Sequence, residues 1–194
     1  DSSRLSTEED YSAAIYSKED LIINGNGTLN VNAGYRNGIK STDDCIIVSG
    51  TLNITSTEDG IIGKDLCGIV AGDININAGS DGIKSTYDTD TTKGNVIIEG
   101  GNITIKASND GIQAENILVI NDGTINIKTN NGAADTTQTH IDNMDMGRGG
   151  FGFNNNKTTT TTDDTSESRK GIKAGNMLII NDGDITIDSD DDSV

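Results

Sequence analysis

The sequence predicts an all-β fold, a parallel β-helix of about six coils with roughly 22 residues in each coil. The first observation is a motif that returns with this period, since Gly50-Thr51-Leu52-Asn53-Ile54 reappears as Gly72-Asp73-Ile74-Asn75-Ile76 and as Gly123-Thr124-Ile125-Asn126-Ile127. The second is composition, because only 32% of the residues are hydrophobic, which suits a stack of thin coils better than a globule with one centre. The third is the absence of proline, which suits strands that pair on both sides.

The first side of each coil is the strand that follows the repeated glycine. Hydrophobic residues alternate there with polar ones, as expected of a strand with one buried face. We expect these residues to point inward: Leu52, Ile54, Ile74, Ile76, Ile103, Ile105, Ile125, Ile127, Ile185 and Ile187. The residues between them should point outward: Asn53, Asn75, Thr104, Asn126 and Thr186.

Two further apolar segments complete each coil. One precedes the repeated glycine and includes Leu21-Ile22-Ile23, Ile46-Ile47-Val48, Val96-Ile97-Ile98, Leu118-Val119-Ile120 and Leu178-Ile179-Ile180. The other carries one isoleucine per coil: Ile39, Ile61, Ile83, Ile112 and Ile172. Three short sides rich in β-branched residues favour a β-helix over a helical solenoid, whose period within a repeat would be near 3.6 residues.

The chain is predicted to form one domain over residues 1–194, with a short insertion near Tyr87–Lys93 and a long one over 133–169. The long insertion is rich in Asn, Thr, Gly and Asp, and we interpret it as a flexible insertion, with a folded lid as the alternative. Because the last residues fall in mid-repeat, we expect the chain to be a fragment of a longer helix.

The net charge of −17 limits the choice of partners. Since the sequence has neither a basic cluster nor an aromatic RNA-binding motif, nucleic acid and anionic membrane surfaces are not expected partners. No apolar run approaches the length of a membrane span, and no signal peptide opens the chain, so any targeting segment is expected to have been removed or to lie outside it.

Acidic residues gather at the Asx-Gly-Ile turns and shortly after them. We predict that they bind Ca²⁺, because carboxylate and amide oxygens are the ligands that this ion prefers. The alternative is that Asp and Asn serve the turn itself by bonding to nearby backbone amides. The candidate metal ligands are Asp43, Asp44, Glu58, Asp59, Asp65, Asp81 and Asp110.

A sparse column of lysines, Lys40, Lys84 and Lys173, runs beside these acids. One interpretation is that the lysines neutralise the acidic column. The other is that calcium and lysine together form a salt-sensitive strip for a uronic-acid chain.

Nucleophilic catalysis finds no support in the sequence. The single histidine, His140, lies in the long insertion, and neither a Gly-x-Ser-x-Gly motif nor a phosphate loop is present. Cys45 and Cys67 should face the core in adjacent coils, either as stacked thiols or as a disulfide.

The chain resembles bacterial carbohydrate-binding β-helix proteins of clostridia, which are similar in fold to pectate-type polysaccharide lyases. The resemblance lies in residues 13–21, the Asp-Gly-Ile-Lys corner at 81–84, the Gly-rich segment 144–150 and the return at 170–173. It implies a right-handed helix, an extracytoplasmic location, either secreted or attached to the cell surface, calcium at the Asp-Gly corners, and binding of cellulose or acidic sugars without established lyase activity. The chain departs from the family's pattern by ending early and by carrying Asn at some corners.

Together with the acidic corners and the polar strand face, the resemblance implies an extracytoplasmic protein that binds a plant cell-wall polysaccharide, such as cellulose or polygalacturonate, with structural or functional calcium. The alternatives are a calcium-dependent uronide lyase, with Lys84 or Lys40 as the base, and a structural or adhesion solenoid. The candidate carbohydrate-binding residues are Lys40, Lys84, Asn53, Asn75, Asn126 and Tyr87.

Overall fold

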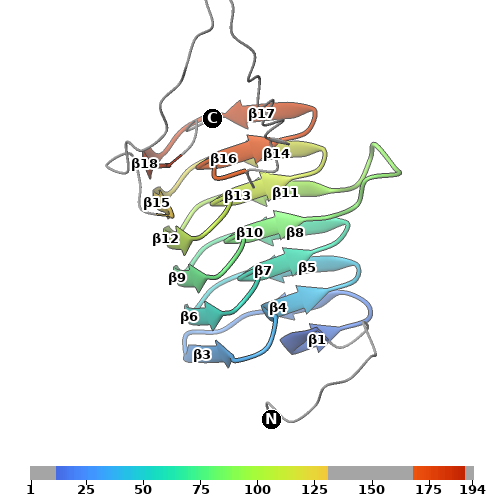
Figure 1. Cartoon of the computed structure of the whole chain (residues 1–194), viewed down its shortest axis with the longest axis vertical. Coiled ribbons are helices and arrows are strands. Elements are labelled where there is room, and N and C mark those ends of the chain that lie inside the picture. Colours follow the sequence, from blue (N-terminus) through green and yellow to red (C-terminus); the bar gives the residue numbers. More distant parts are fainter. Residues whose placement is uncertain (1–11, 131–167, 191–194) are drawn as a thin grey trace, which may run out of the picture.

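The computed structural model describes residues 12–130 and 168–190, and within them it confirms the parallel β-helix. The strands stack into three parallel sheets of six strands each (Figure 1). No helix in these two ranges is long and apolar enough to span a membrane. The predicted long insertion over 133–169 lies almost entirely outside the described residues, and so do His140 and the last four residues.

Each coil contributes one strand to each sheet. Sheet A consists of β1 (Ala13–Ser17), β4 (Asn37–Ser41), β7 (Ile61–Gly63), β10 (Ile83–Ser85), β13 (Ile112–Ala114) and β16 (Ile172–Ala174). Sheet B consists of β2 (Leu21–Ile23), β5 (Asp44–Ile47), β8 (Leu66–Ile69), β11 (Asn95–Ile98), β14 (Ile117–Ile120) and β17 (Met177–Ile180). Sheet C consists of β3 (Thr28–Ala33), β6 (Thr51–Ser56), β9 (Asp73–Ala78), β12 (Asn102–Ala107), β15 (Thr124–Thr129) and β18 (Asp184–Asp188).

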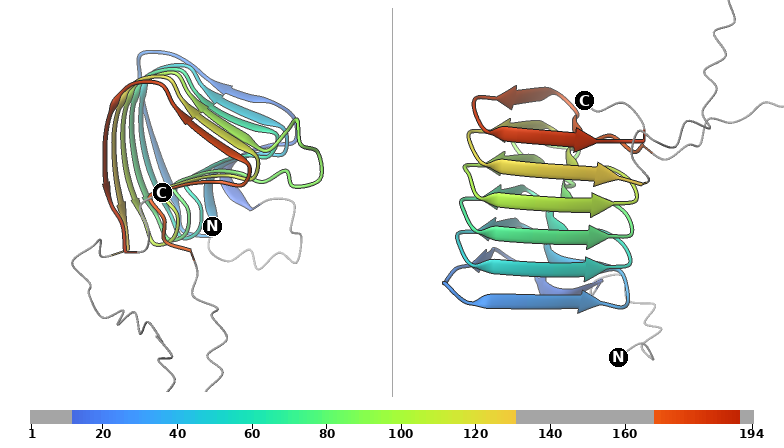
Figure 2. Two further views of the ribbon diagram at one scale, coloured as in Figure 1. Left: turned by 90° about the horizontal axis from the view of Figure 1, so that it is seen from above. Right: turned by 90° about the vertical axis from the view of Figure 1, so that its left-hand side faces the viewer.

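The pairing register puts equivalent residues of successive coils in columns, as the repeat predicts. In sheet C, Ile76 pairs with Ile54 on one side and with Ile105 on the other. Figure 2 shows the resulting triangular stack from above and the flat outer face of sheet C from the side. The inward columns of all three sheets form one core, in which Ile74, Ile83 and Ile98 are fully buried.

Cys45 and Cys67 belong to this core. They are paired in adjacent strands of sheet B, and both are buried free thiols. Burial raises the pKa of Cys45 to about 12, so this thiol stays protonated and unreactive at neutral pH. The structure therefore matches the stacked-thiol interpretation.

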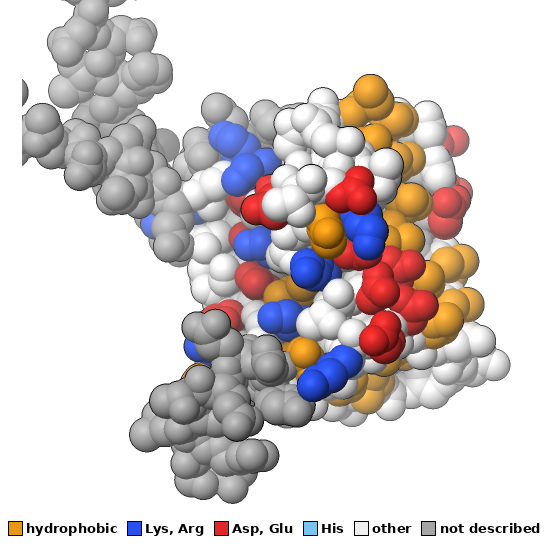
Figure 3. Space-filling model, turned by 90° about the vertical axis from the view of Figure 1, so that its right-hand side faces the viewer, with side chains coloured by type: hydrophobic (Ala, Val, Ile, Leu, Met, Phe, Trp, Pro, Cys, Tyr) orange, Lys and Arg blue, Asp and Glu red, His pale blue; other side chains and the backbone are white. Residues whose placement is uncertain are grey.

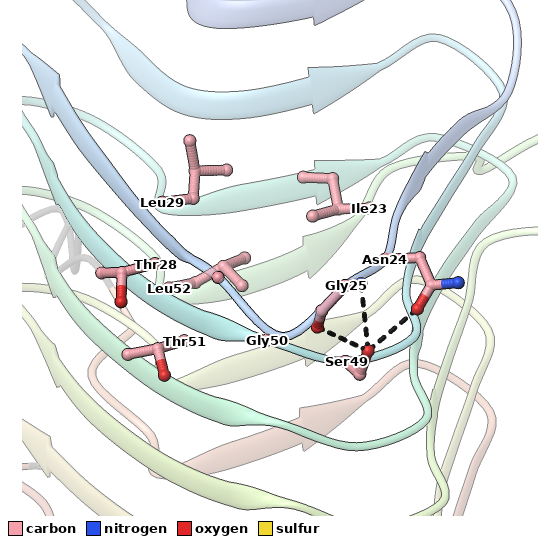
Figure 4. A pocket seen from close by; sticks show the side chains of 10 residues that line it. Ile23, Asn24, Gly25, Thr28, Leu29, Ser49, Gly50, Thr51 and Leu52 are labelled. Carbon is pink, nitrogen blue, oxygen red and sulfur yellow. Dashed lines mark hydrogen bonds between the residues drawn. The ribbon is translucent and has the colours of Figure 1, made fainter.

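Glycine makes the corner between sheets B and C because the backbone there has positive φ. Gly72 has a φ of 119°, and a Cβ at this position would lie 2.7 Å from Gly50 O. At the first such corner, Ser49 Oγ accepts a hydrogen bond from Gly25 N at 3.1 Å and lies 2.8 Å from Asn24 Oδ1 (Figure 4). These contacts join the first two coils at this corner.

The corner between sheets A and B varies in length from coil to coil. In one coil it includes the predicted short insertion near Tyr87–Lys93, which projects from the stack between β10 and β11 (Figure 1). In the other described coils the corner is short, so this segment is a local feature of the molecule's surface.

Candidate functional site

The outer face of sheet C is polar over its whole length, and it carries the asparagines that the sequence predicts to be exposed. Three columns of outward-facing residues run along the stack, and successive residues within a column are separated by the strand spacing of about 4.8 Å. The central column contains Asn30, Asn53, Asn75, Thr104, Asn126 and Thr186. The columns beside it contain Thr28, Thr51, Asp73, Asn102, Thr124 and Asp184, and Asn32, Thr55, Asn77, Lys106, Lys128 and Asp188.

The amides of the central column bond to one another. Asn53 Nδ2 donates to Asn30 Oδ1 at 2.9 Å, and Asn75 Nδ2 donates to Asn53 Oδ1 at 3.1 Å. Each amide nitrogen carries two N–H groups and each carbonyl oxygen accepts twice, so these two bonds leave at least half of the hydrogen-bonding capacity of each amide for a ligand. The ladder thus fixes the orientation of the side chains before a ligand arrives.

A shallow depression lies on this face, with a volume of about 290 Å³. Asn53, Asn75, Thr104 and Lys106 line it, together with neighbouring residues of β6 and β9. Lys106 was not among the predicted site residues. Its position two residues after Thr104 in the alternating strand was the signal that it faces outward. By contrast, Lys128 is held by Asp188 at 2.9 Å.

The Asx residues at the corner between sheets C and A form a ladder, named here the Asx ladder, in which each side chain bonds to the backbone of the next coil. The amide N–H of Asp59 donates to Asn37 Oδ1 at 3.0 Å, and that of Asp81 donates to Asp59 Oδ1 at 3.0 Å. Asp110 N donates to Asp81 Oδ1 at 2.9 Å, and Lys170 N donates to Asp110 Oδ1 at 2.8 Å. Each Asx side chain therefore accepts a hydrogen bond from a backbone amide at the corner of the next coil, as the turn interpretation expects.

The lysine column pairs with the second carboxylate oxygens of this ladder. Lys84 Nζ lies 2.6 Å from Asp81 Oδ2, and Lys173 Nζ lies 3.2 Å from Asp110 Oδ2. Burial raises the pKa of Asp81, although Lys84 acts in the opposite direction. Burial alone would lower the pKa of Lys84, but the hydrogen bond and charge of Asp81 outweigh it and raise the pKa. For these two lysines the geometry matches the neutralising interpretation.

Lys40 differs from the other members of its column. Its Nζ donates to Ser12 Oγ at 3.2 Å, and Asn37 Nδ2 donates to the backbone oxygen of the same serine at 3.0 Å. Because Asn37 is neutral, Lys40 in the second coil has no acidic partner among the ladder residues that the structure describes.

A second acidic group lies at the next corner, between sheets A and B. Asp20, Asp43 and Asp44 bring one carboxylate oxygen each within 4.8 Å of one another. Figure 3 shows acidic side chains gathered on this side of the molecule. Asp65, in the column of Asp43, forms an ion pair with Lys93 from the short insertion.

The pKa values of Asp43 and Asp44 in this cluster are both raised above the usual value of an aspartate. The pKa of Asp43 is raised by its hydrogen bond with Asp65, by burial and by the charges of Asp65, Asp20 and Asp44. Burial raises the pKa of Asp44, and the charges of Asp20 and Asp65 add to this effect. A cation bound here would relieve the repulsion.

The seven predicted metal ligands are therefore divided between two corners. Asp59, Asp81 and Asp110 cap backbone amides at one corner, and Glu58 beside them is exposed, 3.9 Å from Arg36 Nε. Asp43, Asp44 and Asp65 lie at the other. Asp20 was missed, although the register of residues 21–23 with 45–47 places it beside Asp44.

Tyr87, the predicted aromatic contact, lies at the base of the short insertion. Lys64 Nζ and Lys93 Nζ are each 5.0 Å from the centre of its ring. Since two cations already contact this ring, a sugar that stacked on it would have to displace at least one of them.

Comparisons with known proteins agree with a carbohydrate-related role for this fold. A family model described as "Carbohydrate-binding domain-containing protein" matches residues 1–194. A protein of Acetivibrio thermocellus with the same description is 45% identical over 42 residues, which cover 22% of this chain and 15% of that protein.

A solved structure is similar over most of the fold. It is described as the polysaccharide lyase-like protein from C. thermocellum, gadolinium derivative. The TM-score is 0.68 at 27% sequence identity, and the similarity covers 91% of this chain and 57% of the solved chain. This chain thus spans little more than half the length of that neighbour.

Proposed function

Since this chain belongs to the family of carbohydrate-binding domain-containing proteins, we propose that it binds a linear plant cell-wall polysaccharide along the outer face of sheet C. The observation that carries this proposal is the depression lined by Asn53, Asn75, Thr104 and Lys106. Hydroxyl groups of a sugar chain need donors and acceptors at regular intervals, and the polar columns supply them once per coil.

The candidate ligands are cellulose and acidic chains such as polygalacturonate. Lys106 favours an acidic sugar at the depression, whereas the amides serve neutral and acidic sugars equally. Because such polysaccharides lie outside cells, we place the protein outside the cytoplasm, secreted or attached to the cell surface.

Replacing both Asn53 and Asn75 with alanine should weaken glycan binding about thirtyfold, because each side chain contributes a hydrogen bond of about 1 kcal/mol. Both side chains point outward, so the melting temperature should change little. Affinity electrophoresis in gels containing soluble cellulose derivatives or polygalacturonate measures the effect.

Gln113→Ala is the matched control, because it removes an amide from the outer face of sheet A, where Gln113 Nε2 donates to Glu115 Oε1 at 3.0 Å. If this variant loses affinity and the sheet C variant does not, the ligand lies on sheet A and the proposed face is incorrect.

The proposal includes Ca²⁺ at the Asp20, Asp43 and Asp44 cluster. Three carboxylates within 4.8 Å supply the hard oxygen ligands that calcium prefers, whereas the ladder carboxylates are already engaged by backbone amides and lysines. The neighbour described as a gadolinium derivative gives further support, because gadolinium is also a hard, oxygen-seeking cation. When bound, calcium would hold the first two coils together at this corner.

Calcium at about a hundred times its dissociation constant should raise the free energy of unfolding by about 2.7 kcal/mol. The gain should fade in acid, because the raised pKa values of Asp43 and Asp44 let protons compete with calcium. With a chelator the trend reverses, since native carboxyls with raised pKa values bind protons before the unfolded chain does, so stability rises as the pH falls toward those values. Melting curves between pH 7 and pH 4 test both trends, and the absence of any calcium effect at pH 7 would contradict the site.

We propose that the protein binds its polysaccharide without cleaving it, because Lys84 is poorly suited to act as a base. An elimination reaction needs a base, and the raised pKa of Lys84 keeps this side chain protonated at neutral pH. Formation of an unsaturated product from polygalacturonate, detected by ultraviolet absorbance, would contradict this part of the proposal.

A further inference from the structure

The outer face of sheet B is apolar, unlike that of sheet C. One outward column contains Ile22, Ile46, Gly68, Ile97, Val119 and Ile179, named here the apolar strip. Ile22 is 62% exposed, and Val70 and Met177 beside the strip are 44% and 53% exposed. Figure 3 shows hydrophobic side chains in a band that runs along the stack, next to the acidic cluster. Within the strip Ile46, Ile97, Val119 and Ile179 are half-buried. An apolar column on the outer face of a sheet is a candidate interaction surface.

Hydrogen-bonding side chains border the apolar strip. On the side toward sheet C, Asn121 Nδ2 donates to Glu99 Oε2 at 2.9 Å, and Asn181 Nδ2 donates to Asn121 Oδ1 at 2.7 Å. On the other side, Asn95 Oδ1 accepts from Asn116 Nδ2 at 3.0 Å, and Asp44 lies in the same column as Asn95. The columns beside the apolar strip therefore mix hydrogen-bonding side chains with exposed apolar ones such as Val70 and Met177.

We propose that the apolar strip is a second carbohydrate-binding surface, specific for an extended neutral polysaccharide. This inference rests on the proposed function, since it assigns a class of glycan to a second face of the same domain. The pyranose rings of an extended chain present C–H groups on their faces and hydroxyl groups along their edges. The faces would contact the apolar strip, and the hydroxyls would bond to the amides and carboxylates at its margins.

Charge selects a neutral chain over an acidic one. Glu99 borders the strip on the side toward sheet C, and the whole chain carries a net charge of −17. A uronic-acid chain would be repelled at this margin, whereas neutral hydroxyls can donate to the Glu99 carboxylate. Two copies of the protein, each with a net charge of −17, would also repel one another, which disfavours self-association through this face.

Gly68 interrupts the apolar strip near its middle. A Cβ at this position would lie 3.6 Å from Ile46 Cγ1 and 3.8 Å from Ile46 Cγ2, which is ordinary van der Waals contact. Since Gly68 lies within β8 and does not have positive φ, valine is compatible with its backbone. Gly68→Val would therefore extend the apolar strip where the native chain has a gap.

The test measures retention on insoluble cellulose, a neutral β-linked glucan, and on polygalacturonate. The Ile97→Thr/Val119→Thr double variant keeps β-branched side chains on the strand and should reduce retention on cellulose about tenfold, with little change on polygalacturonate. Gly68→Val should increase retention on cellulose about threefold. The Asn53→Ala/Asn75→Ala variant reports separately on sheet C.

Unchanged retention of both strip variants on cellulose overturns the inference, and if the sheet C variant still loses affinity, the proposed function stands. Failure of the native chain to bind either polymer overturns both. Sedimentation velocity tests whether a second copy of the protein binds the apolar strip instead. A native dimer that becomes monomeric in the Ile97→Thr/Val119→Thr variant would show that the strip is a contact between copies. That result would also overturn the inference.

Discussion

Replacing Gly60 with alanine is expected to destabilise the protein by about 3 kcal/mol, which lowers the melting temperature by roughly 10 °C. A Cβ at Gly60 would lie 2.5 Å from Ile76 Cγ2 and 2.5 Å from Gly82 O. The first contact is with a core side chain of sheet C and the second with the backbone of the next coil. Neither atom can move away without disturbing the stack, because both belong to columns that continue through the neighbouring coils.

Gly68→Ala is the control for this prediction. Its new Cβ would approach Ile46 at 3.6 Å without overlap, and removing a glycine from a strand should be neutral or slightly stabilising. Differential scanning calorimetry of both variants measures the contrast. Equal melting temperatures for the two variants would contradict the close packing at the corner between sheets C and A.

Asp81→Ala is expected to cost about 2 kcal/mol, whereas Asp81→Asn should cost less than about 1 kcal/mol. Alanine leaves the buried amide N–H of Asp110 without its acceptor and removes the partner of Lys84. Asparagine keeps an Oδ1 acceptor, and the chain already uses asparagine in this way at Asn37, which accepts from Asp59 N at 3.0 Å. The raised pKa of Asp81 points in the same direction, because the ionised form is the costly one in this environment.

Urea denaturation with and without Ca²⁺ distinguishes two roles for Asp81, as an acceptor for the backbone amide of the next coil or as a calcium ligand. If Asp81 acts through the backbone, both variants should retain the full calcium-dependent gain in stability. If Asp81→Asn abolishes that gain, Asp81 is a calcium ligand, and the assignment of calcium to Asp20, Asp43 and Asp44 would need revision.

The fold could be predicted from the sequence because each structural requirement recurs in every coil. The inward isoleucines, the outward asparagines and the corner glycines each appear at nearly fixed intervals, so Asn53 and Asn75 could be placed on one face without coordinates. The same register predicted that Cys45 and Cys67 would be neighbours in the core.

The arrangement of the acids could not be predicted in the same way. Asp81 and Asp44 are both acids near turns, and only the structure shows that one caps a backbone amide while the other faces like charges across a corner. Asp20 was missed because it precedes the first apolar run, where the repeat is least regular. The apolar strip was overlooked for a different reason, since residues such as Ile97 read as core when both neighbours in sequence are also apolar.

The most direct test of the central claim is a crystal structure of the chain with a bound polygalacturonate or cellulose oligosaccharide. The account predicts a ligand along the outer face of sheet C, with sugar hydroxyls bonded to Asn53 and Asn75. The oligosaccharide should run parallel to the axis along which the coils stack. A ligand held on sheet A by Lys40 and Lys84, with sheet C bare, would contradict it.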